Sequence, residues 1–203
     1  MKPMNILPIA LLASALTFTA GAQNATADKT AAKKVEKTDN SKGSESFMER
    51  YYAVQATYPA LKTLHGNFAA SSHTQEKFIE RYNQIKAAYP KLTDAHGDYA
   101  GSEYSLDEFT KRYFEIKDSY PKMDKYWGDY AGSAKTLPDF VKRYNEIKDS
   151  SPDMSDAYGQ YAASDKNLKE FSSRYYGAKD SKTAMPCYGE YAGCSKKLSK
   201  ESK

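Results

Sequence analysis

Apolar side chains in the middle of the chain recur with the spacing of one face of an α-helix. In one stretch they are separated by 3, 4, 3 and 4 positions, at Leu106, Phe109, Tyr113, Ile116 and Tyr120. This spacing places all five side chains on the same side of a helix. Ser105 precedes the stripe and Glu108 follows three positions later, a capping box whose side chains satisfy two main-chain amides at the helix start. The pattern predicts a long amphipathic helix of about 14 residues.

A second, shorter stripe follows Pro121, with large side chains at Met123, Tyr126, Trp127 and Tyr130. Proline lacks an amide hydrogen and clashes with the preceding turn, so it favours starting a helix over continuing one. Gly132 and Ser133 end the stripe, and glycine suits the left-handed cap of a helix. We therefore predict a helical hairpin, with a second helix of about 10 residues after a short turn, in preference to one continuous helix kinked at each proline.

This hairpin pattern recurs with a fixed period of 31 residues. The phenylalanines that mark the period are Phe47, Phe78, Phe109, Phe140 and Phe171. A fixed period of about 20 to 50 residues is typical of stacked repeats, in which neighbouring hairpins share one core. We expect an all-α fold, a helical-hairpin repeat solenoid of five tandem units, whose divergent first and last units act as end caps. The predicted units are 47–77, 78–108, 109–139, 140–170 and 171–198, followed by a polar tail at 199–203.

The start of the chain has the pattern of a secretory signal peptide over residues 1–22. Lys2 provides the basic start, the stretch from Ile6 to Phe18 is almost continuously apolar, and small residues precede the expected cleavage after Ala22. The apolar run is shorter than the roughly 20 residues that a membrane-spanning helix needs. Residues 23–46 contain no aromatic residue and predict a disordered linker. We expect a secreted or periplasmic protein with no membrane span in the mature chain.

Composition makes tyrosine the main apolar bulk of this protein. The 203 residues include 18 tyrosines, and the mean hydropathy is −0.80. Any core must therefore bury rings whose hydroxyl groups still reach a partner or the rim. The net charge of +4 is too small to indicate a nucleic-acid partner. No nucleophile elbow, zinc-binding histidine pair or phosphate-binding loop occurs, so we expect a protein that is not an enzyme and needs no cofactor.

An arginine follows the recurring phenylalanine by three positions in every unit, at Arg50, Arg81, Arg112, Arg143 and Arg174. The residue after the glycine of each second helix can accept a hydrogen bond, and these residues are Asn67, Asp98, Asp129, Gln160 and Glu190. We expect each arginine to bond to such an acceptor of a neighbouring hairpin, or to an acid four residues earlier, as Glu108 with Arg112. The functional alternative is a ladder that captures an anionic ligand.

A large ring occupies one position of the second helix in four units, at His65, His96, Trp127 and Tyr158. Indole offers no lone pair, so the tryptophan argues against a metal site at this position. We expect a row of rings that are partly buried between hairpins, with their polar tips outward. If the row is instead exposed, it is a candidate binding surface.

The cysteines Cys187 and Cys194 both lie in the last unit. Export favours their oxidation. A regular helix would separate them by about 10 Å, beyond the roughly 7 Å limit for a disulfide. We expect a broken terminal helix closed by a disulfide, and free thiols are the alternative.

Stacked repeats expose long continuous surfaces, and on this fold-level argument we expect an exported scaffold that binds a protein or peptide. The alternative is a cell-surface adhesion or glycan-binding protein that uses tyrosine and tryptophan faces. Most tyrosines, however, occupy stripe positions that the core needs. Aromatic residues outside the stripes, such as Tyr52, Tyr104 and Phe114, do not recur in each unit as a glycan-binding array would require.

Overall fold

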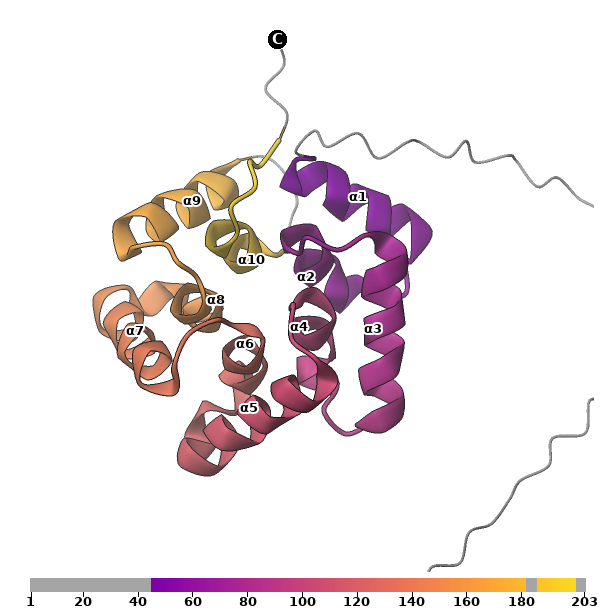
Figure 1. Ribbon diagram of the computed structural model, residues 1–203. Helices are drawn as coiled ribbons and strands as arrows, with labels where there is room; N and C mark the ends of the chain where they lie inside the picture. The colour runs from indigo at the N-terminus through magenta and orange to yellow at the C-terminus, as the bar shows by residue number, and fades with distance from the viewer. Residues whose placement is uncertain (1–44, 182–185, 200–203) are drawn as a thin grey trace, which may run out of the picture. The chain divides into compact units, whose positions relative to one another are not determined.

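The structure is a computed structural model that describes residues 45–181 and 186–199. The predicted signal peptide, the linker as far as residue 44 and the last four residues lie outside this range. Within the described residues all regular structure is helical (Figure 1), which confirms the predicted all-α class.

Ten α-helices, long and short in alternation, occur within the described residues. The long helices are α1 (Phe47–Thr57), α3 (Gln75–Ala88), α5 (Leu106–Ser119), α7 (Leu137–Ser150) and α9 (Leu168–Asp180). The short helices are α2 (His65–Ala70), α4 (His96–Gly101), α6 (Trp127–Gly132), α8 (Tyr158–Ala163) and α10 (Tyr188–Gly193). Four 3₁₀ turns lie before the first four short helices, namely η1 (Lys62–Leu64), η2 (Thr93–Ala95), η3 (Pro121–Tyr126) and η4 (Pro152–Met154).

Local chemistry sets the ends of the long helices as the sequence predicts. Ser105 accepts the amide of Glu108, and the Glu108 carboxylate bonds back to the Ser105 amide, which completes the capping box. α5 ends at Ser119, and the following Tyr120, directly before Pro121, has ψ near 67°, because a residue before proline is pushed out of the helical region. The short helices have six residues rather than about ten, since the stretch after each proline forms a 3₁₀ turn; in η3, Met123 departs from helical geometry at φ −100° and ψ 32°.

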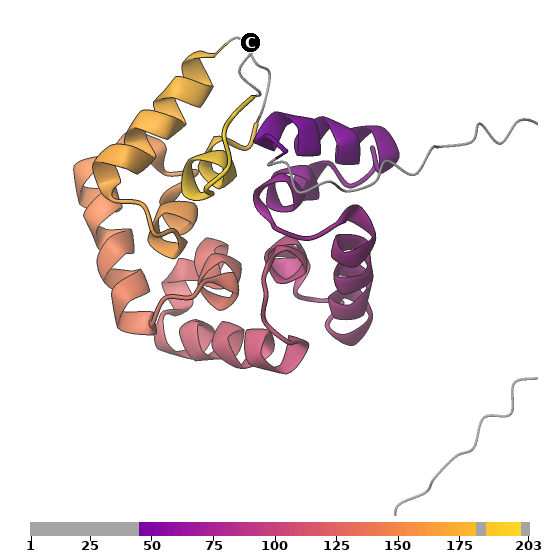
Figure 2. The same cartoon turned by 45° about the horizontal axis from the view of Figure 1, so that its top comes forward.

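Each long helix packs against the short helix that follows it, and each short helix also packs against the short helices on either side. Figures 1 and 2 show the consequence: the short helices surround a common centre and the long helices form an outer layer. The predicted pairing of neighbouring helices is therefore confirmed.

The stack of hairpins closes on itself, so the expectation that the first and last units act as end caps is wrong. α10 packs against α2, and the amides of Phe47 and Met48 donate to the carbonyls of Lys197 and Leu198 at 2.8 and 3.0 Å. The Phe47 ring meets the Tyr191 ring edge-on at 5.5 Å. Repeated heterologous contacts form a ring when their rotation closes, and the five hairpins complete that rotation.

The core is built from the same residue types all around the ring. The five phenylalanines that mark the sequence period are 0–1% exposed. Each packs edge-on against an aromatic ring of the preceding short helix, as Phe109 does with Tyr99 at 5.3 Å. The buried tyrosines have bonded tips: Tyr130 donates to Glu115 at 2.7 Å and Tyr161 donates to Glu146 at 2.6 Å. The expected core of tyrosine rings with satisfied hydroxyl groups is therefore present.

Candidate binding sites

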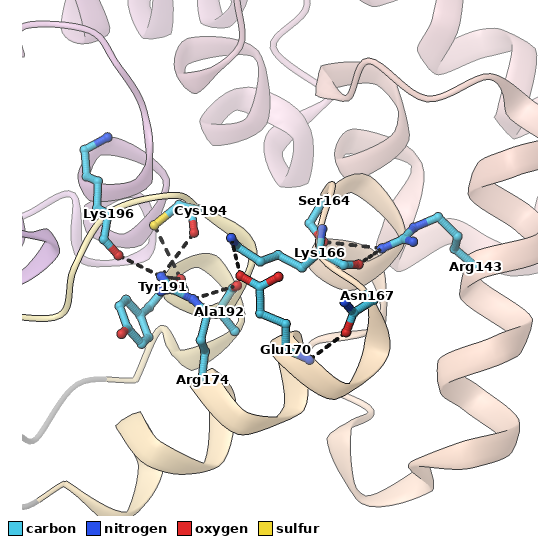
Figure 3. Close-up of polar contacts among 10 residues, drawn as sticks. All are labelled: Arg143, Ser164, Lys166, Asn167, Glu170, Arg174, Tyr191, Ala192, Cys194 and Lys196. Carbon is cyan, nitrogen blue, oxygen red and sulfur yellow. Dashed lines mark hydrogen bonds and ion pairs between the residues drawn. The ribbon is translucent and has the colours of Figure 1, made fainter.

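The five arginines bond to main-chain carbonyls at the end of the short helix in their own hairpin. Arg143 donates to the carbonyls of Tyr161 and Lys166 at 2.8 and 2.6 Å. Arg174 donates to those of Tyr191 and Lys196 at 2.9 and 2.7 Å (Figure 3). A cation at the C-terminus of a helix interacts favourably with the helix dipole. The arginines therefore cap the short helices.

Each guanidinium group also stacks on an aromatic ring of the helix that it caps. The guanidinium carbon lies 4.2–4.3 Å from the ring centroid in all five hairpins, over Phe68, Tyr99, Tyr130, Tyr161 and Tyr191. Neither predicted partner of the arginines is correct, since the bonds go to main-chain carbonyls of the same hairpin. The carbonyls bond to the N–H groups at the edge of each guanidinium, and the aromatic ring covers one of its faces. These contacts argue against a ladder of arginines that binds an anionic ligand.

The ring position of the short helices supplies a hydrogen-bond donor to the end of the preceding long helix. Nε2 of His65 and of His96 lie 2.9 Å from the carbonyl oxygens of Tyr58 and Tyr89. Trp127 Nε1 donates in the same way to Tyr120 O at 3.1 Å, whereas Tyr158 Oη donates to Pro152 O at 3.0 Å, at the start of η4. The expected outward polar tips are therefore wrong, because all four tips bond to main-chain carbonyls of their own hairpins. Imidazole, indole and phenol interchange here because each carries an N–H or O–H at its far end.

The two cysteines are free thiols, so the predicted disulfide is wrong. Cys187 precedes α10 and Cys194 follows it, and the regular helix between them keeps the two side chains apart. Cys194 Sγ donates to Tyr191 O at 3.4 Å, as Ser164 Oγ does to Tyr161 O at 2.9 Å in the hairpin before it. Burial raises the pKa of both thiols.

A cavity of about 240 Å³ lies at the centre of the ring, lined by residues of all five short helices and their C-terminal ends. The side chains that the sequence analysis selected as acceptors line it together, and we call them the acceptor row: Asn67, Asp98, Asp129, Gln160 and Glu190. The remaining lining residues are small or carry a hydroxyl or thiol group. The cavity is therefore polar, and three of the five side chains of the acceptor row are acidic.

Each member of the acceptor row lies against the glycine of the next short helix. A Cβ atom on Gly128 would collide with Asp98 Oδ2, and one on Gly159 would collide with Asp129 Oδ2. The relation continues across the junction of the ring, where a Cβ on Gly66 would lie 3.0 Å from Glu190 Oε1. The recurring glycine is therefore required by the close approach of a polar side chain.

The carboxylates of the acceptor row have no cationic side chain beside them in the cavity wall. Asn67 Nδ2 donates to Asp98 Oδ1 at 2.9 Å. Burial, together with repulsion from Glu190, raises the pKa of Asp98 to about 7. Burial raises the pKa of Asp129 well above its usual range, with Asp98 adding to the effect. Burial likewise raises the pKa of Glu190. Each of these carboxyl groups therefore keeps its proton to a higher pH than an exposed carboxyl group does.

The third hairpin carries a patch of aromatic residues that are exposed or, in the case of Trp127, half-buried. Phe114 and Tyr120 are 40% and 38% exposed, and Lys117 Nζ lies 5.6 Å from the ring centroids of both Phe114 and Trp127. We call Phe114, Lys117, Tyr120 and Trp127 the third-hairpin patch. The sequence analysis noted Phe114 as an aromatic residue outside the stripes but assigned no role to it.

Comparison with known proteins does not identify the site, because no family model, curated protein or solved structure matches the chain. Among the described residues, no three His, Cys, Asp or Glu side chains gather closely enough to hold a metal ion. The described helices include none that has the length and apolar character to cross a membrane.

Proposed function

We propose that the protein is an exported, non-enzymatic interaction module that binds a protein or peptide partner through the third-hairpin patch. Five 31-residue units behind a cleaved signal peptide (1–22) and a linker (23–46) are part of this proposal. Ring closure removes the long open face on which a solenoid would bind a partner, so support comes from the patch instead. Exposed clusters of apolar side chains on a small protein mark interaction surfaces.

The observation that carries the proposal is that the hairpins on either side fold without an aromatic residue at the position of Phe114. Asn83 and Asn145 occupy the position of Phe114 in the hairpins on either side, and both are exposed. His96 occupies the position of Trp127 and makes the same bond to a main-chain carbonyl. Phe114 therefore adds exposed aromatic surface that both neighbouring hairpins lack at this position.

A protein or peptide fits this patch better than a glycan does. Tryptophan and tyrosine dominate the binding energy of protein interfaces, and Lys117 between two rings adds a cation for an acidic group of the partner. A glycan-binding array would repeat its platform in every hairpin, whereas the position that Tyr52 and Phe114 share in the first and third hairpins is asparagine in the second and fourth. Adhesion to glycans remains the alternative that the experiment must separate.

The test replaces the patch with residues that the neighbouring hairpin already uses. The mature chain and its Phe114→Asn, Trp127→His double variant are immobilised and exposed to envelope and culture-medium proteins. We expect one protein to bind the unsubstituted chain and to be lost from the double variant, which should keep the helical fold. The Asn145→Phe variant is the control for added apolar surface. Equal capture by all three chains, or retention of the mature chain by polysaccharide alone, would overturn the proposal.

A further inference from the structure

We propose that the start of α1 is a peptide-binding site for a segment with a lysine two residues before a leucine, and that the C-terminal segment of the chain occupies it. We call residues 196–198, Lys-Lys-Leu, the strap. The strap follows the fifth hairpin but bonds to the first, so it meets α1 through non-covalent contacts alone (Figures 1 and 2). The site is separate from the third-hairpin patch and does not depend on the proposed function.

The first argument is that α1 lacks the start that the other long helices have. α3, α5, α7 and α9 begin three residues before the recurring phenylalanine, whereas α1 begins at Phe47 itself. In the other hairpins the amide of this phenylalanine donates to the carbonyl four residues earlier, as that of Phe109 does at 3.0 Å. Phe47 instead donates to Lys197 O at 2.8 Å. The amide of Met48 likewise donates to Leu198 O at 3.0 Å. The strap therefore takes the place of the missing first turn, whose amides a helix cannot satisfy by itself.

The second argument is that the strap repeats a pattern found at the start of two interior helices. A lysine stands two residues before a leucine at Lys135–Leu137 and at Lys166–Leu168, and each of these leucines is the first residue of a long helix. Leu198 packs against the core cluster that contains Phe47, as the interior leucines pack against the clusters of their own phenylalanines. α1 therefore receives from the other end of the chain a segment that α7 and α9 carry covalently.

The lysine of the strap contributes a contact with a second element of the first hairpin. Lys196 Nζ donates to Ala70 O at 3.1 Å and to Ser71 O at 2.7 Å, at the C-terminal end of α2. A cation is favoured at the C-terminal end of a helix, where carbonyl groups lack helical partners. Arg174 donates to Lys196 O at 2.7 Å from within the fifth hairpin (Figure 3). The side chain of Lys196 thus crosses the junction while its main chain is held on the other side.

These contacts define the ligand that the site accepts. The ligand offers two successive main-chain carbonyls to the first amides of α1, a leucine side chain to the core and an ammonium group to the end of α2. A peptide of this pattern from another molecule makes the same contacts once the strap is absent. While the strap is bound, the apparent affinity for such a peptide is reduced by the fraction of chains whose site is free. The strap therefore keeps the site closed in the intact protein.

The test supplies the strap as a separate peptide. The probe is Ser-Ser-Lys-Lys-Leu-Ser, which copies residues 194–199 with serine in place of the cysteine, and its receptor is the full chain carrying Lys196→Ser and Leu198→Ser. We expect the amides of Phe47 and Met48 to exchange at least about ten-fold faster in this double variant than in the unsubstituted chain, and saturating peptide to restore their protection. Fluorescence anisotropy of labelled peptide should show at least about ten-fold tighter binding to the double variant than to the unsubstituted chain.

An interior copy of the pattern provides the matched control. Lys166→Ser with Leu168→Ser removes the same residue types where the chain runs on into α9, so the amide of Phe171 should stay protected and the peptide should not bind. The single variant Leu198→Ser keeps Lys196 and repeats the comparison with a smaller loss of contacts. Unchanged protection at the start of α1 in both strap variants, or no saturable binding of the peptide to either, would overturn the proposal. Equal binding to the unsubstituted chain, or of a peptide with serine in place of the first lysine and the leucine, would also overturn it.

Discussion

Glu190 lies against Gly66, so that the last short helix contacts the first through the same kind of pair that joins the interior hairpins. A Cβ on Gly66 would lie 3.0 Å from Glu190 Oε1, and the corresponding pairs inside the ring are Asp98 with Gly128 and Asp129 with Gly159. The glycine leaves space for the polar side chain, and that side chain then lines the central cavity. Ring closure and the cavity therefore depend on one repeated contact.

Substitution of the close-packed glycine should destabilise the ring. A Cβ on Gly128 would collide with Asp98 Oδ2 and would lie 3.2 Å from the main chain at Ala95. We expect Gly128→Ala to lower the free energy of unfolding by about 1 to 3 kcal/mol, the usual cost of overpacking. Gly177 in α9 has no atom within 4 Å of a Cβ, so Gly177→Ala should instead raise it by up to about 1 kcal/mol. Urea unfolding measures both effects. A gain in stability for Gly128→Ala would contradict the prediction, because it would show that Asp98 and the main chain at Ala95 move aside without cost.

The acceptor row should make the protein less stable as the pH rises. The pKa of Asp98 is raised to about 7, and burial also raises those of Asp129 and Glu190. The unfolded chain loses these protons at lower pH than the folded chain, so between about pH 5 and about pH 7 the free energy of unfolding should fall. Each unit of pKa difference corresponds to about 1.4 kcal/mol.

Asp98→Asn isolates this contribution, because the amide cannot ionise and the first hairpin already carries Asn67 at this position. We expect the variant to show a flatter dependence of the urea midpoint on pH and to exceed the unsubstituted chain at about pH 8. Asp118→Asn replaces an exposed acid of α5 and serves as the control, which should retain the original slope. Parallel pH profiles for Asp98→Asn and the unsubstituted chain would mean that Asp98 is ionised throughout.

Loss of an arginine cap should cost stability rather than ligand affinity. Arg112 donates to the carbonyls of Tyr130, Ser133 and Lys135 at 2.8–3.0 Å, and its guanidinium carbon lies 4.3 Å from the Tyr130 ring centroid. We expect Arg112→Ala to lower the free energy of unfolding by about 1.5 to 3 kcal/mol, the range for hydrogen bonds to a charged group. Arg112→Lys should recover only part of this loss, because an ammonium cannot reproduce the planar fork. If Arg112→Ala left the melting temperature unchanged but abolished binding of an anionic ligand, the alternative of an arginine ladder that captures such a ligand would be supported instead.

At the ring position of the short helices, the hydrogen-bond donor of the side chain should contribute more to stability than the hydrophobicity of the side chain does. Trp127 Nε1 donates to Tyr120 O at 3.1 Å, and histidine makes the equivalent bond at position 96. We expect Trp127→His to be more stable than Trp127→Phe by about 1 kcal/mol, because phenylalanine leaves the carbonyl without its partner. Phenylalanine is the more apolar of the two, so burial alone predicts the opposite order. Thermal unfolding of the two variants side by side decides between them.

Much of the fold follows from local patterns in the sequence. The spacing from Leu106 to Tyr120, the capping box at Ser105 and the proline after Tyr120 set the bounds of α5. Closure could not be predicted, because it depends on the rotation between successive hairpins, and neither Phe47 nor Tyr191 reveals that angle. The partners of Arg112 were missed for a related reason: main-chain carbonyls at a helix end have no sequence signature of their own.

The central cavity was predictable in its residues but not in its geometry. The acceptor row was recognised because a polar residue follows the glycine in each unit, and the sequence analysis assigned it to the arginines. Arg112 and Asp129 recur with the same spacing in every unit, and this spacing would be the same whether or not the two side chains bond to each other. The sequence period therefore could not show that Arg112 caps α6 while Asp129 lines the cavity. The cysteines show the same limit: the distance across a regular helix argued against a disulfide, and α10 remains regular between Cys187 and Cys194.

Closure of the ring predicts that the first hairpin is as tightly held as the interior ones. Phe47 and Phe109 are each 0% exposed, and they contact Tyr191 and Tyr99 edge-on at 5.5 and 5.3 Å. Phe47→Ala should therefore cost about 3 to 5 kcal/mol, as a fully buried phenylalanine does, and should match Phe109→Ala. In an open stack of hairpins, Phe47 would lie at an end and its loss would be much milder. Urea unfolding of the two variants distinguishes these architectures, and hydrogen exchange gives an independent measure, because the amides of Phe47 and Met48 should be protected by their bonds to Lys197 and Leu198.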